Sequence, residues 1–213
     1  KESYKREIII GLGLVQTTAG NQGISDYANE NYGPAARKFD LSAEVAGMFD
    51  VLDTMAIFNA ALCYEKANDI DNAVARYKTC GESGYQVPNV FLFAANILRQ
   101  NGRTEDALIE LQSARVQFPR EQSLIIEELN IYLEAQDYAR AENNLKLAAE
   151  GDPDNEILWF SLGSVYDNLD KTEMAAEAYL KAISIAPDYF DANYNLGAMY
   201  FNQAVEGINA AND

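Results

Sequence analysis

Residues 158–187 read LWFSLGSVYDNLDKTEMAAEAYLKAISIAP, with apolar side chains three or four positions apart, as at Leu158, Leu162 and Val165. This spacing is typical of one face of an α-helix. Residues 168–172 then interrupt the pattern with polar side chains of the kind that end one helix and begin the next. The stretch therefore predicts two helices joined by a tight turn.

The same pattern recurs with a period of 34 residues. Large side chains align at Tyr64, Leu98, Tyr132, Tyr166 and Tyr200, small ones at Ala73, Ala107, Ala141 and Ala175, and prolines at Pro119, Pro153 and Pro187. Because these columns keep one register, we predict complete repeats at residues 54–87, 88–121, 122–155 and 156–189. We expect an N-terminal helix plus an imperfect repeat at 1–53, and the first helix of a further, truncated repeat at 190–213. We expect the tyrosine columns to lie in the packed interior.

The small residues of the repeat have a packing role. Antiparallel helices approach closely where one side chain is small, and a larger neighbour fills the space around it. Residues 156–189 match the tetratricopeptide repeat signature at Trp159, Leu162, Gly163, Tyr166, Ala175, Tyr179, Ala182 and Pro187, so the chain resembles that family. The resemblance implies an all-α fold, a right-handed α-α superhelical solenoid of 34-residue helix-turn-helix repeats. A narrower similarity to envelope-associated tetratricopeptide proteins of the Bacteroidetes implies a bacterial protein that is exported, periplasmic or in the cell envelope rather than cytoplasmic.

The two ends depart from the regular pattern. Residues 1–15 predict a helix that runs into an imperfect repeat at roughly 16–49, and we expect Gly11 and Gly13 to pack against another helix. The helix that begins at Phe190 is not followed by a second helix, so we expect its apolar face to be left for another partner. We therefore expect the chain to be a segment of a longer array.

Charge and missing residue types exclude several function classes. Asp and Glu number 33 against 16 Lys and Arg, and the resulting net charge of −17 opposes binding to nucleic acid and to anionic membranes. The sequence has no histidine, and Cys63 and Cys80 form no metal or disulfide pattern, so we expect them to pack as apolar residues. The longest apolar run, residues 8–14, is too short to span a bilayer. We predict no cofactor, no metal site and no direct membrane insertion.

Three motifs that suggest chemistry are assigned to structure instead. The GxG at residues 11–13 lacks the third glycine and the strand of a dinucleotide site. The acidic stretch at 152–156 lacks the glycine and distal Glu of a calcium loop, and we expect it to cap the next helix. Adjacent helical residues such as Glu127 and Glu128 point in different directions, and no nucleophile is nearby. The sequence therefore predicts a protein that is not an enzyme.

The resemblance also implies where a ligand binds, because first helices of successive repeats line a concave groove in that family. Groove-facing candidates are Asn59, Glu65, Asn96, Arg99, Glu127, Asn130, Glu134, Ser161, Ser164, Asp167 and Asn195, with Leu62 and Ala198 beside them. One column, Asn59, Phe93, Glu127, Ser161 and Asn195, does not repeat in character. Another, Asn96, Asn130 and Ser164, either pairs with a ligand backbone or forms a solvated polar face. The acidic members favour a basic or neutral peptide.

Two functions follow from these features. The first is a non-catalytic protein-protein interaction scaffold that binds a peptide or partner protein in the groove. The alternative is a structural assembly module that self-associates, or docks onto other parts of its parent protein, through residues 190–206.

Overall fold

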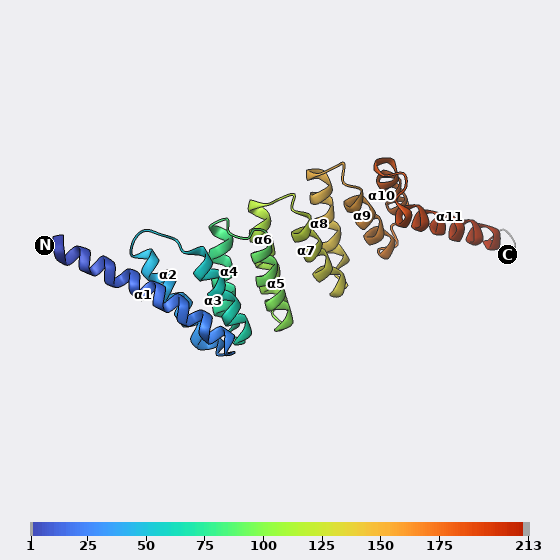
Figure 1. Ribbon diagram of the computed structural model, residues 1–213. Helices are drawn as coiled ribbons and strands as arrows, with labels where there is room; N and C mark the ends of the chain where they lie inside the picture. The colour runs from blue at the N-terminus through green and yellow to red at the C-terminus, as the bar shows by residue number, and fades with distance from the viewer. Residues whose placement is uncertain (1, 211–213) are drawn as a thin grey trace. The chain divides into compact units, whose positions relative to one another are not determined.

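The computed structural model describes residues 2–210, and Lys1 and residues 211–213, which the predicted first and last segments include, lie outside it. Every element in the described range is an α-helix, so the predicted all-α solenoid of helical hairpins is confirmed. In chain order the helices are α1 (Glu2–Ala28), α2 (Tyr32–Gly47), α3 (Thr54–Lys66), α4 (Ile70–Glu82), α5 (Asn89–Gln100), α6 (Thr104–Gln117), α7 (Gln122–Glu134), α8 (Tyr138–Gly151), α9 (Glu156–Asn168), α10 (Thr172–Ile185) and α11 (Phe190–Ala210) (Figure 1).

The helices form two compact units, one ending at Ala114 and the other beginning at Arg115. In the first unit α1 packs on α2, α2 on α3, α3 on α4 and α4 on α5. In the second, α7 packs on α8, α8 on α9, α9 on α10 and α10 on α11. Within each unit these helices therefore pack against their neighbours in sequence, which is the contact pattern of stacked helical repeats.

The turns between paired helices share one backbone conformation, which recurs with the period of the sequence repeat. Asn68, Gly102, Gln136 and Asp170, spaced 34 residues apart, all have positive φ, between 54° and 74°. A left-handed residue satisfies the carbonyls at the end of a helix and turns the chain back. Since Gly tolerates this conformation best and Asn next best, Gln136 and Asp170 hold it at a small cost. The turn position therefore recurs even where its residue type does not.

Close approach of α9 and α10 explains the small residues of the opening stretch. A Cβ atom added to Gly163 would lie 2.6 Å from the ring of Tyr179, closer than such contacts occur. Tyr179, Ala175 and Ala182 are fully buried. The predicted packing role of these residues is confirmed, as is the burial of Cys63 and Cys80 as free thiols.

Helix starts are fixed by side-chain caps where the sequence supplies them. Asp53, Asp69 and Asp137 accept backbone hydrogen bonds from the residue three positions later, at the starts of α3, α4 and α8. Asn155 accepts from the amides of Ile157 and Leu158 at the start of α9. The predicted capping role of residues 152–156 is confirmed, because this side chain satisfies amides that the helix leaves unpaired.

A buried polar cluster interrupts the repeat at the start of the second unit. Glu128 is 2% exposed and stands in a column held by Ala60, Ala94 and Leu162 in other repeats. Arg115 Nη1 donates to Glu128 Oε2 at 2.7 Å and also contacts Asn144 Oδ1. Burial raises the pKa of the Glu128 carboxyl, and the Arg115 charge opposes this. The cluster ties the end of α6 to α7 and α8.

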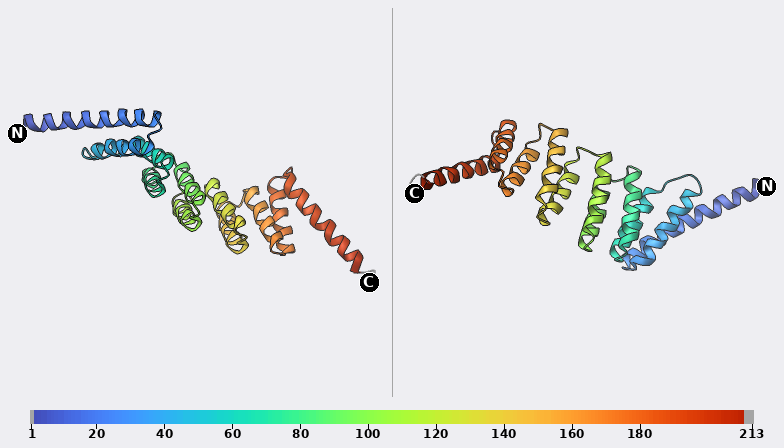
Figure 2. Two further views of the ribbon diagram at one scale, coloured as in Figure 1. Left: turned by 90° about the horizontal axis from the view of Figure 1, so that it is seen from below. Right: turned by 180° about the vertical axis from the view of Figure 1, so that it is seen from behind.

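Two packing expectations are wrong. Nothing lies within 4 Å of a Cβ added at Gly11 or Gly13, because α1 continues past the end of α2 and no helix covers it there (Figure 2). Tyr200 was expected in the interior with Tyr64, Tyr132 and Tyr166, which are buried, yet it is 49% exposed. It lies on α11, which packs against α10.

Candidate protein-binding surfaces

An open pocket lies between α1, α2 and α3 in the first unit. Its volume is about 230 Å³ and its walls are Ile24, Tyr27, Phe39, Asn59, Leu62 and Cys63. A second hollow of about 350 Å³ shares Ile24, Phe39 and Asn59 and extends toward Asp53 and Met55. Two predicted groove residues, Asn59 and Leu62, thus line one pocket. Its walls suit an apolar side chain, and the Asn59 amide can both donate to and accept from a peptide backbone.

Aromatic rings of α3, α4, α5 and the segment between α4 and α5 gather in the first unit. Ring centroids are 5.9 Å apart for Phe58 and Tyr77, 5.7 Å for Phe58 and Tyr85, and 5.6 Å for Tyr77 and Phe93. Phe93 is 39% exposed, so its ring offers apolar surface to a partner. Aromatic side chains are enriched among the residues that dominate binding energy.

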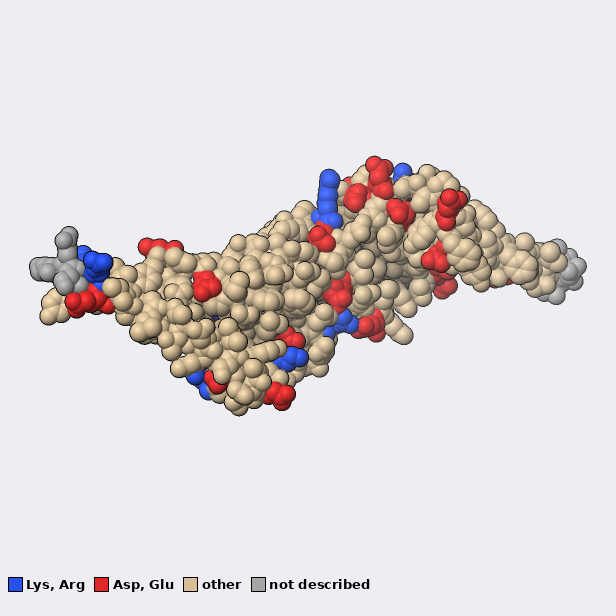
Figure 3. Space-filling model, in the orientation of Figure 1, with Lys and Arg blue, Asp and Glu red and all other residues tan. Residues whose placement is uncertain are grey.

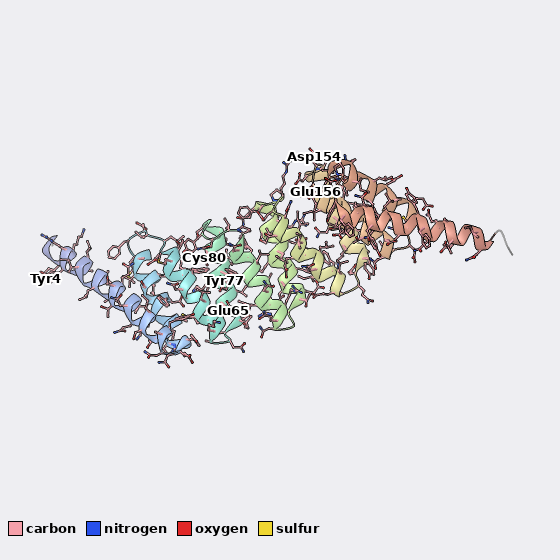
Figure 4. All side chains as sticks on the ribbon, turned by 45° about the vertical axis from the view of Figure 1, so that its right-hand side comes forward. Tyr4, Glu65, Tyr77, Cys80, Asp154 and Glu156 are labelled. Carbon is pink, nitrogen blue, oxygen red and sulfur yellow. The ribbon has the colours of Figure 1, made fainter. Side chains whose placement is uncertain are left out.

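Glu65 is fixed at the polar edge of these rings. The Tyr77 hydroxyl of α4 donates to Glu65 Oε2 of α3 at 2.7 Å (Figure 4). Burial, followed by this hydrogen bond, raises the pKa of the Tyr77 hydroxyl well above its ordinary value. A half-buried carboxylate held in this way places negative charge next to an apolar surface. A basic side chain of a ligand is the complement of that charge.

Two further predicted site residues of this unit lie on α5. The side chain of Asn96 is exposed, and that of Arg99 is half-buried. In the second unit, Asn130, Glu134 and Asp167 are exposed and Glu127 and Ser161 are half-buried. They remain candidates by position alone.

Two predicted site residues of the second unit are brought together by a buried tyrosine. The Tyr179 hydroxyl donates to Ser164 Oγ at 3.3 Å and accepts from Asn195 Nδ2 at 3.3 Å. Ser164 thus differs from its column mates Asn96 and Asn130, which are exposed. The repeat pattern places Tyr77 and Tyr179 inside but does not indicate which polar side chains their hydroxyls meet. The sequence signal for these contacts was a polar residue at the ninth position of a repeat, as at Ser164, or at the twelfth, as at Glu65.

The last helix has two faces of different character. Ala192, Leu196 and Met199 are buried on the side toward α10. Phe190, Tyr194, Phe201, Val205 and Ile208 are exposed. Figure 3 shows few charged atoms over this end of the chain. Exposed large apolar residues at this helical spacing mark an interaction surface.

Within residues 2–210, no cluster of three or more His, Cys, Asp or Glu side chains is placed to hold a metal ion. None of the helices in the same range is both long and apolar enough to cross a membrane.

Comparison with known proteins places the repeat in a family. A tetratricopeptide repeat model matches residues 55–83, and a TPR repeat model matches residues 169–203. These two segments of the chain resemble tetratricopeptide repeats. Proteins built from such repeats commonly bind peptides or other proteins and are typically non-catalytic.

Solved structures of repeat proteins have the same fold. A TPR repeats protein from Bacteroides fragilis superposes with a TM-score of 0.65 at 15% identity, covering 87% of this chain and 97% of that one. The MamA protein superposes with a TM-score of 0.52 at 21% identity, covering 71% and 82%. At these identities the similarity concerns the fold alone.

Curated relatives are similar over short stretches. A peroxisomal targeting signal receptor of Candida albicans is 42% identical over 50 residues, 24% of this chain. The receptor of the same name from Kluyveromyces lactis is 30% identical over 67 residues, 32% of this chain. The chain spans only 8% and 12% of these two receptors. The similarity therefore concerns a small part of each receptor.

Proposed function

We propose that the chain is a non-catalytic scaffold that binds a peptide segment of another protein on the first helices of its repeats. The observation that carries this proposal is the open pocket at Asn59 and Leu62, whose walls are mostly apolar and include the Asn59 amide. An apolar side chain of the ligand fills the pocket, and its backbone pairs with Asn59. Neither step requires chemistry.

The charge at the edge of the aromatic rings selects the ligand. Glu65 lies at the edge of the aromatic rings, and the chain carries a net charge of −17. A neutral or basic peptide is attracted to this surface, and an acidic one is repelled. The ligand that fits best therefore has a large apolar residue near a Lys or Arg.

Selection from a displayed library of random peptides tests this proposal. We expect the chain to enrich peptides that combine a large apolar residue with a nearby Lys or Arg. Leu62→Asp should weaken the selected peptides about tenfold or more, because it introduces a charge into the apolar pocket. Ile109→Asp is the matched control, since Ile109 is exposed on α6, away from the pocket. Equal affinity of both variants would remove the pocket from the account.

The predicted polar residues of the surface need a separate test. Asn96, Arg99 and Asn130 changed together to Ala should reduce peptide affinity if the amides pair with the ligand backbone. Unchanged affinity would assign these side chains to a solvated polar face instead.

A second candidate function is assembly through α11, which the exposed side chains of that helix favour. The chain would pack against a copy of itself or against another protein through Phe190, Tyr194 and Phe201. Light scattering over a range of concentrations separates these cases, because self-association raises the mass as concentration rises. A constant monomer mass would exclude self-association, and Phe201→Asp should abolish any that occurs.

We also keep the narrower assignment, to envelope-associated tetratricopeptide proteins of the Bacteroidetes, as a prediction. It places the parent protein outside the cytoplasm. Fractionation of the source cells with an antibody against the chain tests this location, and recovery in the cytosolic fraction would contradict it.

A further inference from the structure

The pocket and the second hollow of the first unit adjoin one another and share Ile24, Phe39 and Asn59. Phe39 of α2 is 5% exposed, so its ring lies at their common floor. α1 packs closely on this ring, since a Cβ added to Gly23 would lie 3.1 Å from it. This tight contact holds the ring in place. The pocket and the second hollow therefore form one continuous, preformed surface between α1 and α3.

The two parts of this surface differ in polarity. The pocket adds the apolar walls of Tyr27, Leu62 and Cys63 to the shared residues, so it suits a large apolar side chain. The second hollow has a volume of about 350 Å³ and adds a polar set of side chains beside Met55 and Ala56. The members of that set are Gln16, Thr17, Asn21, Ser42 and Asp53. The second hollow therefore suits a side chain that ends in a polar group.

The charge of the second hollow is that of Asp53, since its other polar walls are neutral amides and hydroxyls. Asp53 Oδ1 accepts from the backbone amide of Ala56 at 3.0 Å, and Oδ2 accepts from Gln16 Nε2 at 3.4 Å. An ionised carboxylate offers about four acceptor positions, so half-buried Asp53 can still receive a donor. An ammonium or guanidinium group is the complement of this hollow, and a carboxylate is repelled by it.

Helix geometry gives the spacing between the two parts of the surface. Residues 53–59 line the second hollow and residues 59–63 line the pocket. The midpoints of these stretches, residues 56 and 61, are about 7.5 Å apart along a helix. In an extended peptide, side chains two residues apart point to the same side and are separated by about 6.6 Å. Asn59 lies between the two midpoints, where its amide can pair with the peptide backbone.

We propose that this surface binds an extended segment of another protein in which a large apolar residue and an Arg or Lys are separated by one residue. The apolar side chain fills the pocket, and the cationic group pairs with Asp53 in the second hollow. This inference rests on the proposed function and adds to it the spacing of the two side chains and the carboxylate that receives the cation. Glu65, at the other end of α3, is the complement of a basic residue on the far side of the apolar one.

Fluorophore-labelled synthetic peptides test the spacing and the charge. The probe has Phe-Thr-Arg between flanking serines and threonines, and it is made in both chain directions so that the tighter-binding order becomes the reference. In that order, one variant replaces Arg by Gln, and another exchanges Arg with the central Thr, which turns the cation to the opposite side of the strand. Titration with the full chain, followed by fluorescence anisotropy, should show that the reference binds about tenfold more tightly than either variant.

Matched variants of two helix caps locate the cation on the protein. Asp53→Asn removes the charge but keeps the cap of α3, because Asn and Asp cap helices equally well. It should weaken the reference peptide about tenfold and leave the Gln peptide unchanged. Asp69→Asn is the control, since it makes the same change at the cap of α4 and Asp69 lines neither the pocket nor the second hollow. It should leave both affinities unchanged, and circular dichroism verifies that both variants keep their helices.

The outcomes separate this inference from the proposed function. Absence of binding in both chain directions, equal binding of the Arg and Gln peptides, or equal effects of Asp53→Asn and Asp69→Asn would overturn the inference. Loss of the preference for Arg in Glu65→Gln, but not in Asp53→Asn, would assign the cation to Glu65 and overturn it as well. In each case the proposed function stands if Leu62→Asp still weakens the library-selected peptides, and it fails if Leu62→Asp does not.

Discussion

Tyr77 of α4 and Tyr179 of α10 occupy the same column of the repeat, three periods apart, and both are fully buried, yet their hydroxyls meet different partners. Tyr77 donates to the Glu65 carboxylate at 2.7 Å. Tyr179 is linked to the neutral side chains of Ser164 and Asn195 at 3.3 Å. The same packing element thus supports a charged edge in the first unit and a neutral polar one in the second.

The repeat columns around the two tyrosines also differ between the units, because the first unit has apolar side chains where the second has polar ones. Leu62 and Phe93 of the first unit correspond to Ser164 and Asn195 of the second. The first pair lies at the pocket and at the aromatic rings, and the second pair is tied to Tyr179. A column that repeats is therefore explained by helix packing, whereas a column that changes gives each unit its own surface.

The largest expected effect concerns helix approach in the second unit. Gly163→Ala should destabilise the chain by about 1–3 kcal/mol, because the new Cβ meets the Tyr179 ring. Gly197→Ala, the same change in the same column, should be neutral or stabilise by about 0.5–1 kcal/mol, because alanine favours helix and the space is open. Urea unfolding followed by circular dichroism measures both. Effects of the same sign would contradict the difference between the two glycines.

The tyrosine hydroxyls give the next effect. Tyr77→Phe removes a hydrogen bond to a carboxylate and should cost about 1.5–3 kcal/mol of unfolding free energy. Tyr179→Phe removes longer bonds between neutral groups and should cost about 0.5–1.5 kcal/mol. Equal losses in urea unfolding would show that the two hydroxyls contribute alike despite their different partners.

Alkaline pH tests the buried tyrosines of the first unit. Burial and the hydrogen bond to Asp40 raise the pKa of Tyr64 to about 12, and the pKa of Tyr77 is raised further. A raised tyrosine pKa stabilises the fold at pH values below the unfolded pKa of about 10, and this stability is lost as pH rises through the folded value. Urea midpoints should therefore fall between about pH 10 and 12. Tyr64→Phe should flatten that fall, and an unchanged slope would contradict it.

The smallest effect concerns the turns of the two hairpins. Asn68 and Asp170 have φ of 58° and 55°. Asp170→Gly should stabilise by about 0.5 kcal/mol, since glycine adopts this conformation without strain but is more flexible when unfolded. Asn68→Gly should change stability less, because asparagine already tolerates the conformation. A larger gain at Asn68, measured by urea unfolding, would reverse this ranking.

The fold could be predicted because the same pattern of packing and turn residues recurs in each repeat. Gly163 and Ala175 recur as small residues where helices approach, and the polar stretch at 168–172 recurs where the chain turns. Burial of Cys63 and Cys80 was expected because they form no metal or disulfide pattern. Local patterns of this kind depend on helix geometry alone.

Features that depend on three-dimensional partners could not be predicted in the same way. Glu128 has an apolar counterpart in other repeats, and its compensation by Arg115 requires knowing that the end of α6 meets α7. The expected packing of Gly11 and Gly13 failed because α1 is longer than the helix beside it. A periodic pattern does not show where its covering helix ends.

The candidate site was predictable only as a set of positions. Asn59 and Leu62 follow from the helix face, but their pocket also needs Ile24 and Phe39 from the imperfect N-terminal repeat. Glu65 was selected for its charge, whereas its bond to Tyr77 comes from a residue assigned to the interior. Side-chain partners across helices are set by packing that one helix face does not encode.

Exchange of the differing columns tests most directly whether they carry the binding function. Leu62→Ser with Phe93→Asn gives the first unit the residues of the second, and Ser164→Leu with Asn195→Phe makes the reverse change. Affinities for a library-selected peptide are measured by titration calorimetry. We predict that the first exchange weakens binding about tenfold or more and that the second leaves it unchanged. Full affinity after the first exchange, or loss only after the second, would contradict the account.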